Sequence, residues 1–387
     1  MRILFLTPRA PWPPTRGDQL RALELARQLG RRASVTLLCT GDHEARARVE
    51  PLPGVDVVVV PRSPSGTLLA NATTAPCTPL QVRVYQDLRL RRVIAQTIDE
   101  LRPDVVHAHM VRMAPYLPAG PWHRHLDVMD AYSVNMASRA EASRGPARAV
   151  FRLESRLVGR YEAVAAARAD TMSVVSAADR DDVPALAGAA VVANGVDPDA
   201  VPFAAPDERP PEIVFFGNLG YFHNVEPSRW LAAEVLPLVR RELPEARLRL
   251  VGMRPAAAVA KLAELPGVDV VGPVPRMVDE LHRAAVAAIP MFTGSGIKNK
   301  VLEAFSAGTP LVANALAVQG VDDGRPGEHY LAAESPAEFA DACLALLRDG
   351  ARRRALAEAA RALVVDRYSW SAAADRLLAV YDATPSG

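Results

Sequence analysis

The sequence predicts a two-domain α/β protein with a doubly wound parallel sheet in each domain. Three observations lead to this fold class. The chain has 387 residues, more than a single hydrophobic core usually serves. Short runs of Val, Ile and Leu alternate with longer helical patterns, which is typical of βαβ units. Residues 195–212 are rich in Pro and Asp and interrupt this alternation, as a linker between domains would.

The strands expected in the first half are short and apolar, as parallel strands buried on both faces are. They lie at residues 2–7, 34–39, 55–60, 104–109, 126–130, 171–176 and 190–194. The helix predicted after the first strand has an apolar face formed by Leu20, Leu23 and Ala26.

The alternation starts again at Ile213, which places the junction of the domains near residue 205. Five more strands are expected, at residues 213–217, 248–252, 268–272, 285–290 and 310–314. We therefore expect one domain over residues 1–204 and a second over residues 205–368. Ligands of such sheets bind at the carboxyl ends of the strands, where the strand order reverses. The cleft between the two domains is thus the expected binding site.

Composition argues against several classes of protein. Apolar residues make up 50% of the chain and charged residues 23%, as in a globular protein. The net charge of +1 gives no electrostatic reason to expect a nucleic acid partner. Three scattered cysteines, Cys39, Cys77 and Cys343, suggest neither a disulfide framework nor a zinc cluster, and they fit a reducing cytoplasm. We expect no signal peptide and no transmembrane segment, because no apolar run is long enough.

The loop after the first strand is suited to an anion. It runs as TPRAPWPPTRG to Gly17, and Asp18 is expected to cap the helix that follows. Gly17 would let a ligand approach the backbone at a helix N-terminus, where anions bind well. A plain tight turn is the alternative interpretation.

A second glycine-rich loop, TGSGIKNK at residues 293–300, also joins an apolar strand to a helix. Its backbone N–H groups could hold a diphosphate, although neither the Walker spacing nor GxGxxG is present. Two of the three lysines among 45 basic residues fall here, Lys298 and Lys300. A compact ammonium suits a phosphate, and the concentration of lysine favours that role. The alternative is a local ion pair between Lys300 and Glu303 on one helix face.

Several segments in order resemble the glycosyltransferases of family 4, which have the GT-B fold. GSGIKNKVLEAFSAGTPLVAN is similar to the nucleotide-sugar signature of the subset with GxGIxNKVLEA. The segments TPRAPWPPTRGDQLRALELARQL, PDVVHAH, VVSAADR, VVANGVD and FFGNLGYFHNVEPSRWLAAEVLP resemble further motifs of the family. The likeness covers the whole chain, and the last helix, residues 369–387, is implied to cross back onto the first domain.

The resemblance implies a role for each matching position. Glu303 would bind the ribose hydroxyls, and the backbone at Val274 would contact the base. Amides at Ser295, Gly296 and Ile297 would face the diphosphate and the sugar, with positive charge from Lys298 and Lys300. Gly17 would close on the same phosphates. His109 would lie on the acceptor side, although a histidine ending a buried strand is often a satisfied core residue. Asp130 could orient His109 or contact the acceptor, and the alternative is that it merely caps a turn.

Two positions depart from the family pattern. Ser295 stands where many relatives have a second glutamate, eight residues before Glu303. Asn218 and Asn224 stand where many relatives have Arg and Lys. Without those two cations, Lys298 and Lys300 would carry more of the diphosphate charge.

The function expected from the resemblance is transfer of a sugar from a UDP-, GDP- or dTDP-sugar to an acceptor hydroxyl. The acceptor would be a bacterial polysaccharide or lipid-linked precursor, or a secondary metabolite. Retention at the anomeric carbon is implied, with no cofactor and no metal, since Asp322 and Asp323 fit a solvated loop better than a metal site. The alternatives are a nucleotide-sugar epimerase and a catalytically silent nucleotide-sugar-binding protein.

An arginine series with four-residue spacing predicts a basic helical stripe, at Arg144, Arg148, Arg152, Arg156 and Arg160. An apolar stripe at Leu153, Leu157, Tyr161 and Val164 runs beside it. Such a helix can lie on an anionic membrane, which would make the protein cytoplasmic and peripheral at the inner face, or it can attract a phosphorylated acceptor. The alternative is a solvated domain helix whose arginines pair with Glu154 and Glu162.

Overall fold

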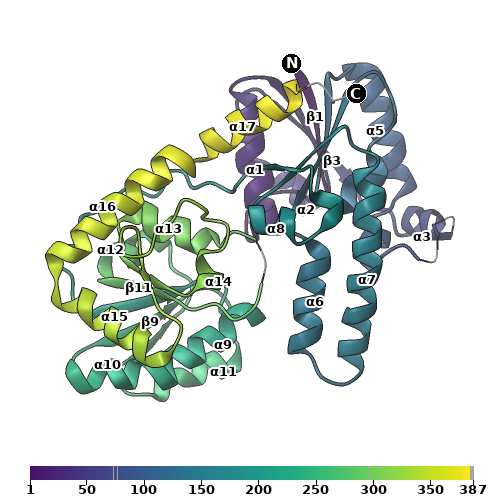
Figure 1. Cartoon of the computed structure of the whole chain (residues 1–387). Coiled ribbons are helices and arrows are strands. Elements are labelled where there is room, and N and C mark those ends of the chain that lie inside the picture. The colour runs from purple at the N-terminus through teal and green to yellow at the C-terminus, as the bar shows by residue number, and fades with distance from the viewer. Residues whose placement is uncertain (73, 76, 295, 384–387) are drawn as a thin grey trace. The chain divides into compact units, whose positions relative to one another are not determined.

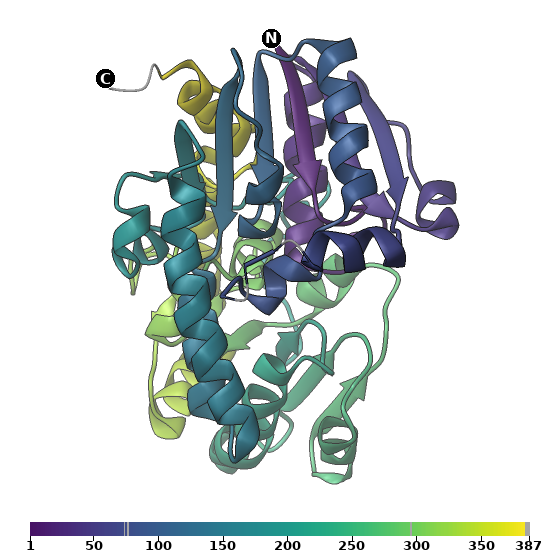
Figure 2. The same cartoon turned by 90° about the vertical axis from the view of Figure 1, so that its right-hand side faces the viewer.

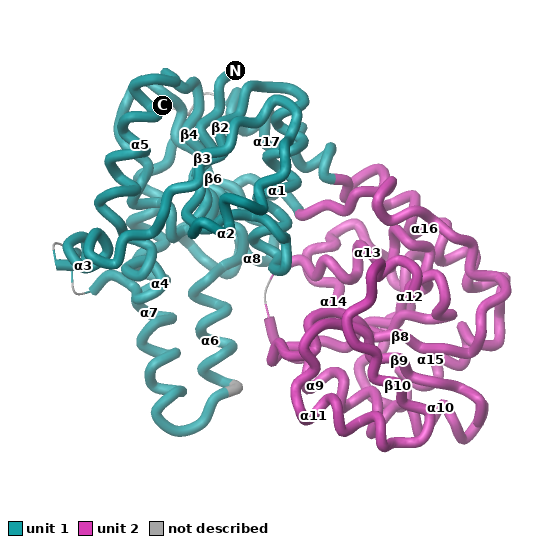
Figure 3. Tube along the Cα trace, turned by 180° about the vertical axis from the view of Figure 1, so that it is seen from behind, with its two compact units in different colours: residues 1–193, 370–387 teal, residues 194–369 magenta. Residues whose placement is uncertain are grey.

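The computed structural model describes residues 1–383 except 73, 76 and 295. It divides into two compact units, one of residues 1–193 with 370–387 and one of residues 194–369 (Figure 3). Each unit holds one parallel sheet with helices on both faces, so the predicted fold class is confirmed. Among the described residues, no helix has the length and apolar character that a membrane span requires.

Unit 1 contains a seven-stranded parallel sheet with the order β3-β2-β1-β4-β5-β6-β7. Its strands are β1 (Arg2–Thr7), β2 (Ser34–Gly41), β3 (Val55–Pro61), β4 (Val105–His109), β5 (His123–Met129), β6 (Thr171–Val174) and β7 (Ala190–Val191). All seven were predicted, because buried β-branched and leucine-rich runs are a strong signal.

The helices of unit 1 cover both faces of this sheet (Figures 1 and 2). They are α1 (Gly17–Gly30), α2 (His43–Ala47), α3 (Pro64–Ala72), α4 (Leu80–Arg83), α5 (Leu88–Leu101), η1 (Val111–Tyr116), α6 (Tyr132–Ala142), α7 (Pro146–Ala166), α8 (Ala177–Asp181), η2 (Pro184–Leu186) and α17 (Trp370–Asp382). Strand alternation sends Ile3 and Phe5 toward α1 and α17, and Leu4 and Leu6 toward α5. The C-terminal helix α17 therefore completes the core of unit 1.

Unit 2 contains a six-stranded parallel sheet with the order β10-β9-β8-β11-β12-β13. The strands are β8 (Glu212–Phe216), β9 (Arg247–Val251), β10 (Val268–Val271), β11 (Val286–Ile289), β12 (Leu311–Ala313) and β13 (Leu331–Ala332). The helices are α9 (Phe222–Trp230), η3 (Leu231–Val235), α10 (Leu236–Glu242), α11 (Ala257–Ala260), η4 (Lys261–Glu264), α12 (Met277–Arg283), α13 (Asn299–Ala307), α14 (Ala315–Val318), α15 (Pro336–Arg348) and α16 (Gly350–Arg367). Sequence reasoning missed β13. Strand β7 is equally short but begins the apolar run AVVA, whereas the segment around Leu331 and Ala332 includes His329 and Glu334 and gives no such signal.

The Pro- and Asp-rich stretch at residues 195–212 packs against unit 2. Arg209 donates from Nη1 to the carbonyls of Leu281 and Ala284, both at 2.9 Å. Arg353 donates from Nε to the carbonyl of Pro206 at 2.8 Å. The composition of residues 195–212 indicated a lack of regular structure. The contacts of Arg209 and Arg353 show that this irregular backbone is nevertheless hydrogen-bonded to arginine side chains.

Both sheets reverse their strand order at one point. In unit 1 the reversal lies between β1 and β4, and in unit 2 between β8 and β11. Connections from these neighbouring strands leave in opposite directions, so a crevice forms at their carboxyl ends. The loops after β1 and β4, and those after β8 and β11, are thus where each unit can best bind a ligand.

Candidate functional site

Two loops meet at the switch point of unit 2. Gly217 and Asn218 follow β8, while the glycine-rich loop at residues 290–298 follows β11 and leads into α13. Sequence and topology therefore agree on this edge of the sheet. Ser295, with its predicted role toward the donor diphosphate, lies outside the described residues.

Glycines at this edge of the sheet leave the backbone without side chains. Gly217 has a φ of 136°, a value that favours glycine. A Cβ on Gly252 would stand 1.6 Å from the carbonyl oxygen of Gly217, so the ends of β8 and β9 approach too closely for any side chain there. A Cβ on Gly217 itself would lie 3.3 Å from Asn224 Nδ2 and 3.6 Å from Lys300 Nζ.

Lys300 reaches from α13 across the switch point toward the loop after β8. Its ammonium donates to Asn224 Oδ1 at 2.8 Å and lies 4.2 Å from the centroid of the Phe215 ring. The side chain is half-buried, and burial lowers the pKa of Lys300 to about 7. The ammonium is therefore poorly solvated, and an anion placed beside it would be strongly attracted.

Glu303 lies one turn further along α13. Burial raises the pKa of its carboxyl to about 7, although the Lys300 ammonium acts in the opposite direction. Within the part of the chain that the structure describes, no ion pair within 4.0 Å joins Lys300 to Glu303. Lys300 is instead bonded to Asn224, so the alternative of a simple helix-surface ion pair does not account for its position.

Hydrogen bonds hold other residues of the loop in place. Lys298 donates from Nζ to the carbonyl of Gly296 at 2.5 Å. Ile297 is buried, and Gly296 has a φ of 71°. His223 of α9 and Thr293 share a hydrogen bond of 2.5 Å between Nδ1 and Oγ1. The loop is thereby held to the first turn of α9.

Asn218 and Val274 lie on the loops after β8 and β10. The Asn218 side chain accepts from the backbone N–H of Gly220 at 3.1 Å, and its carbonyl accepts from Asn224 Nδ2 at 2.9 Å. Asn224 therefore links two elements, with its Nδ2 on the β8 loop and its Oδ1 on Lys300. Val274 is half-buried in the loop between β10 and α12.

In unit 1, Gly17 is the first residue of α1 and is exposed. Within the described residues, no heavy atom lies within 4 Å of the position that its Cβ would take. Asp18 is not the helix cap, contrary to our expectation, because α1 already begins at Gly17 and Arg16 takes the cap position. The Asp18 carboxylate lies 3.2 Å from Arg9 Nε instead.

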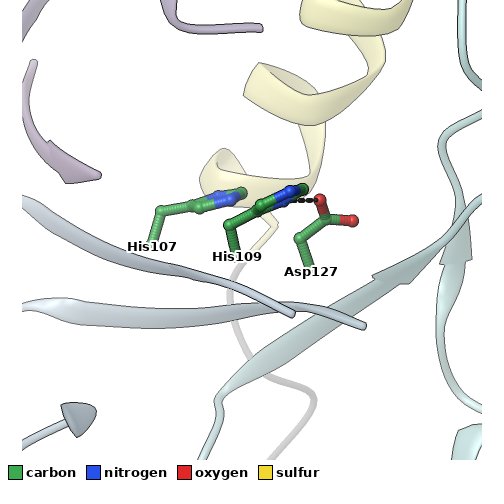
Figure 4. A group of neighbouring side chains, drawn as sticks. All are labelled: His107, His109 and Asp127. Carbon is green, nitrogen blue, oxygen red and sulfur yellow. Dashed lines mark hydrogen bonds and ion pairs between the residues drawn. The ribbon is translucent and has the colours of Figure 1, made fainter. Parts of the chain in front are cut away.

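His109 ends β4 and is fully buried. Its Nδ1 lies 2.9 Å from Asp127 Oδ2, and its Nε2 lies 3.1 Å from the backbone carbonyl of Asp18 (Figure 4). Both ring nitrogens of His109 therefore face oxygen atoms that can accept a hydrogen bond. His109 thus ties the carboxyl end of β4 to the first turn of α1.

Asp127 and Arg21 complete this network, and sequence reasoning missed both. Arg21 of α1 donates from Nε and Nη2 to the two carboxylate oxygens of Asp127, each at 2.9 Å, and both side chains are fully buried. Arg21 and His109 hold the pKa of Asp127 well below its ordinary range, although burial acts in the opposite direction. We had considered Asp130 as the partner of His109, but Asp127 fills that place. A charged residue inside the apolar run HLDVM was the available signal.

His107, His109 and Asp127 are close enough to hold a metal, with ligand atoms within 4.8 Å of one another. Arg21 already contacts both oxygens of Asp127, and His107 Nδ1 lies 2.7 Å from the hydroxyl of Tyr381. Burial lowers the pKa of His107 well below its ordinary value, so this histidine is neutral. A guanidinium on the shared carboxylate makes the group a hydrogen-bond network rather than a cation site.

Two family models match the chain. One, described as Glycosyltransferase Family 4, matches residues 16–200. The other, described as Glycosyl transferases group 1, matches residues 210–349. Each match falls largely within one of the two structural units. The second includes β8 and β11, the strands at the switch point of unit 2, and the first includes β4 but starts after β1.

Curated proteins with similar sequences are glycosyltransferases. A D-inositol 3-phosphate glycosyltransferase of Xylanimonas cellulosilytica is 30% identical, over 94% of this chain and 91% of that protein. A glycogen synthase of Mycobacterium tuberculosis is 28% identical, over 86% of this chain and 81% of that protein.

Solved structures share the fold. A sucrose-phosphate synthase from Thermosynechococcus elongatus aligns with a TM-score of 0.74 and 17% identity, over 98% of both chains. Anabaena HepE, in complex with UDP and glucose, aligns with a TM-score of 0.69 and 16% identity, again over 98% of both chains.

Proposed function

Because this chain belongs to family 4 of the glycosyltransferases, we propose that it moves a sugar from a nucleoside diphosphate sugar to an acceptor hydroxyl. The acceptor is a polysaccharide or lipid-linked precursor, or a secondary metabolite. We further propose that transfer retains the anomeric configuration and needs no metal. The relatives named above support the class of reaction, and HepE, whose structure holds UDP and glucose, supports the class of donor.

The observation that carries this proposal is the place of Lys300. Its poorly solvated ammonium lies at the switch point of unit 2, beside bare glycine backbone and one residue inside the start of α13. A diphosphate bound there would meet the ammonium, the amides of Gly296 and Ile297, and a helix N-terminus. Lys298 would add charge from the preceding turn. Asn218 and Asn224, with no charge of their own, would orient the phosphate groups and Lys300.

We propose roles for four further residues, two in each unit. We assign Glu303, one turn into α13, to the ribose hydroxyls, and the backbone of Val274 to the base. Gly17, exposed at the start of α1, offers backbone N–H groups to the phosphates. His109 takes a positioning role, because both of its nitrogens are bonded within unit 1 and the carbonyl that it contacts belongs to the residue after Gly17.

The chemistry follows from where charge develops. As the bond between the sugar and the diphosphate breaks, the sugar gains oxocarbenium character and the leaving oxygen gains negative charge. Lys300 and the loop amides stabilise that charge. The acceptor oxygen bonds to the anomeric carbon from the same face, and its proton passes to the departing phosphate. Asp322 and Asp323 are exposed in a loop, and Asp323 lies 3.9 Å from Arg367, so we assign neither to a metal.

A donor panel tests the proposal. UDP-, GDP- and dTDP-sugars are added to the protein with EDTA, and the melting temperature is measured. One donor is expected to raise it, since a ligand at about 100 times its Kd adds about 2.7 kcal/mol to the free energy of unfolding. When candidate acceptors are added, release of nucleoside diphosphate reports transfer. The coupling constant of the anomeric proton in the product reports its stereochemistry.

Three results would contradict the proposal in different ways. Stabilisation by no donor would remove the donor site. Rearrangement of the donor without an acceptor would indicate an epimerase. Tight donor binding without release of nucleoside diphosphate for any acceptor would indicate a silent binding protein.

A second proposal concerns α7, whose outer face is basic and apolar. Arg148, Arg152 and Arg156 are exposed, as are Val150 at 61% and Leu153 at 59%. Among the described residues, Glu154 forms no ion pair within 4.0 Å with these arginines, and its carboxylate accepts from the backbone N–H groups of Leu80 and Gln81 on α4. We infer that this face, with the exposed Leu80 beside it, binds anionic membranes.

Pelleting with vesicles of phosphatidylglycerol and phosphatidylcholine tests this contact. The wild type is expected to sediment with anionic vesicles at low salt, and less as salt screens the attraction. Arg148→Gln/Arg152→Gln/Arg156→Gln should stay in the supernatant. The control, Arg241→Gln/Arg276→Gln/Arg352→Gln, removes three exposed arginines of unit 2 and should sediment as the wild type. If the wild type does not sediment, α7 is a solvated domain helix.

A further inference from the structure

A cavity of about 630 Å³ opens in unit 1 at the carboxyl ends of β1, β2 and β3. Residues 8–10, which follow β1, form part of its wall, and the same loop leads on to Gly17. Trp12 and Tyr85 give the cavity aromatic surface, while Gln19, Thr40 and His43 give it polar groups. Its place beside the switch point of unit 1 suits it to an acceptor.

Three guanidinium groups surround the ring of Tyr85. Their central carbons lie 5.0 Å from the ring centroid for Arg62, 5.2 Å for Arg112 and 5.9 Å for Arg9. Arg9 also donates from Nη2 to the Tyr85 hydroxyl at 2.9 Å. Arg9 and Arg62 line the cavity itself, and Arg112, only 7% exposed, packs against the same ring.

These arginines are not equally neutralised. Arg9 lies 3.2 Å from the Asp18 carboxylate. Arg62 donates to the carbonyl of Val84, and Arg112 donates to the hydroxyl of Tyr132 at 3.0 Å. Within the part of the chain that the structure describes, neither Arg62 nor Arg112 has a carboxylate within 4.0 Å, and the buried Nε of Arg112 has no hydrogen-bond partner.

The acidic residues that line the cavity are already engaged. The Asp42 side chain accepts from the backbone N–H of Ala45 and caps α2. Glu44 pairs with Arg48 at 3.2 Å. Arg62 and Arg112, which have no carboxylate partner among the described residues, place two like charges beside Tyr85, and these charges repel each other. An anion entering the cavity would relieve this repulsion and gain charge-assisted hydrogen bonds.

We infer that the acceptor of this enzyme carries a phosphate group, and that Arg9 and Arg62 bind this phosphate beside the ring of Tyr85. Guanidinium groups match phosphate oxygens in geometry, and Arg62 has donors left for them. The aromatic walls then suit the apolar face of a sugar or cyclitol. That the bound phosphate belongs to an acceptor rests on the proposed function. Binding of an anion in this cavity can be tested independently of that function.

The test measures binding by isothermal titration at constant ionic strength, with the donor site first saturated with UDP. The probes are inorganic phosphate, glucose 6-phosphate and glucose. A fourth arm uses vesicles containing phosphatidylinositol, which separates a lipid-borne phosphate from a soluble one. Arg62→Gln changes an exposed side chain, so the fold should survive. Arg46→Gln is the matched control, because Arg46 is exposed on α2 and outside the cavity wall.

We expect phosphate and at least one of the phosphorylated probes to bind, and glucose to bind more weakly. Arg62→Gln should raise the Kd of the phosphorylated probe by about tenfold, the effect of losing one charge-assisted hydrogen bond. Arg46→Gln should leave it unchanged, and UDP should bind equally to all three proteins. Phosphate binding that ignores Arg62, or no binding in any arm, overturns the inference. Failure of UDP, GDP and dTDP alike to bind the wild type would instead contradict the proposed function.

Discussion

Replacement of Lys300 by methionine is expected to lower the turnover number by about 10²- to 10³-fold, the cost of removing one preorganised group that stabilises charge in a transition state. Methionine keeps most of the side-chain volume and removes the ammonium that lies between Asn224 and the Phe215 ring. Melting temperature should stay the same or rise, because burial disfavours the ammonium and lowers the pKa of Lys300 to about 7. Loss of turnover with retained stability would mark Lys300 as functional.

Two controls sharpen this expectation. Lys261→Met removes the lysine outside the loop, which is exposed on η4, and should leave turnover unchanged. Lys300→Arg keeps the charge but brings a planar group into the space beside Gly217, so it should recover only part of the activity. Adding Lys298→Met to Lys300→Met should lower turnover further. Near-normal turnover in that double variant would remove both lysines from the donor site.

The pH dependence of UDP affinity gives a second measure of the same role. A diphosphate binds the protonated form of Lys300, so binding takes up a proton wherever the free site has lost one. With a pKa of about 7 in the free protein, affinity for UDP should fall as pH rises above neutrality. Titrations in buffers of different ionisation enthalpy would show the proton uptake. Lys300→Met should abolish this fall in affinity.

Much of the fold could be predicted because its signals are local. Twelve of the strands appear in the sequence as short, largely apolar runs, and parallel sheets make such runs nearly continuous. The two-residue strand β13 is held by its pairing with β12 and has no pattern of its own. Helix starts were less certain, and α1 begins at Gly17 without a side-chain cap, so the acidic residue that we expected as cap lies inside the first turn.

The part of the donor site that is formed by residues close together in the sequence could be predicted. Lys298, Lys300 and Glu303 fall within one loop and one helical turn. The contact between Lys300 and Asn224 joins positions 76 residues apart, and no local sequence pattern predicts it. The same holds for Asp127, whose partners Arg21 and His109 come from different elements. Such networks depend on which strands are neighbours, and the strand order becomes visible only in three dimensions.

The buried pair of Arg21 and Asp127 should matter more for folding than any other ion pair described above. Asp127→Asn leaves the Arg21 guanidinium in the core of unit 1 without its counter-charge, and breaking such a pair costs about 3–5 kcal/mol of unfolding free energy. Urea unfolding followed by circular dichroism measures this loss. Because the pKa of Asp127 is depressed in the folded protein, its contribution is present at neutral pH and is lost as the pH falls into the acid range.

The double variant Arg21→Met/Asp127→Leu distinguishes two causes of lost stability. One is a buried guanidinium without a counter-charge, and the other is the loss of the attraction within the pair. With both charges gone, the core should recover much of its stability, since apolar residues can replace a buried pair at little cost. Glu242→Gln is the matched control. Glu242 pairs with Arg348 at 3.2 Å, but both side chains are more than half exposed, so its loss should cost about 0–1 kcal/mol. Equal costs for Asp127→Asn and Glu242→Gln would mean that the buried network does not stabilise unit 1. A double variant as unstable as Asp127→Asn would point instead to the shape of the Arg21 side chain, which fills the space between β4, β5 and α1.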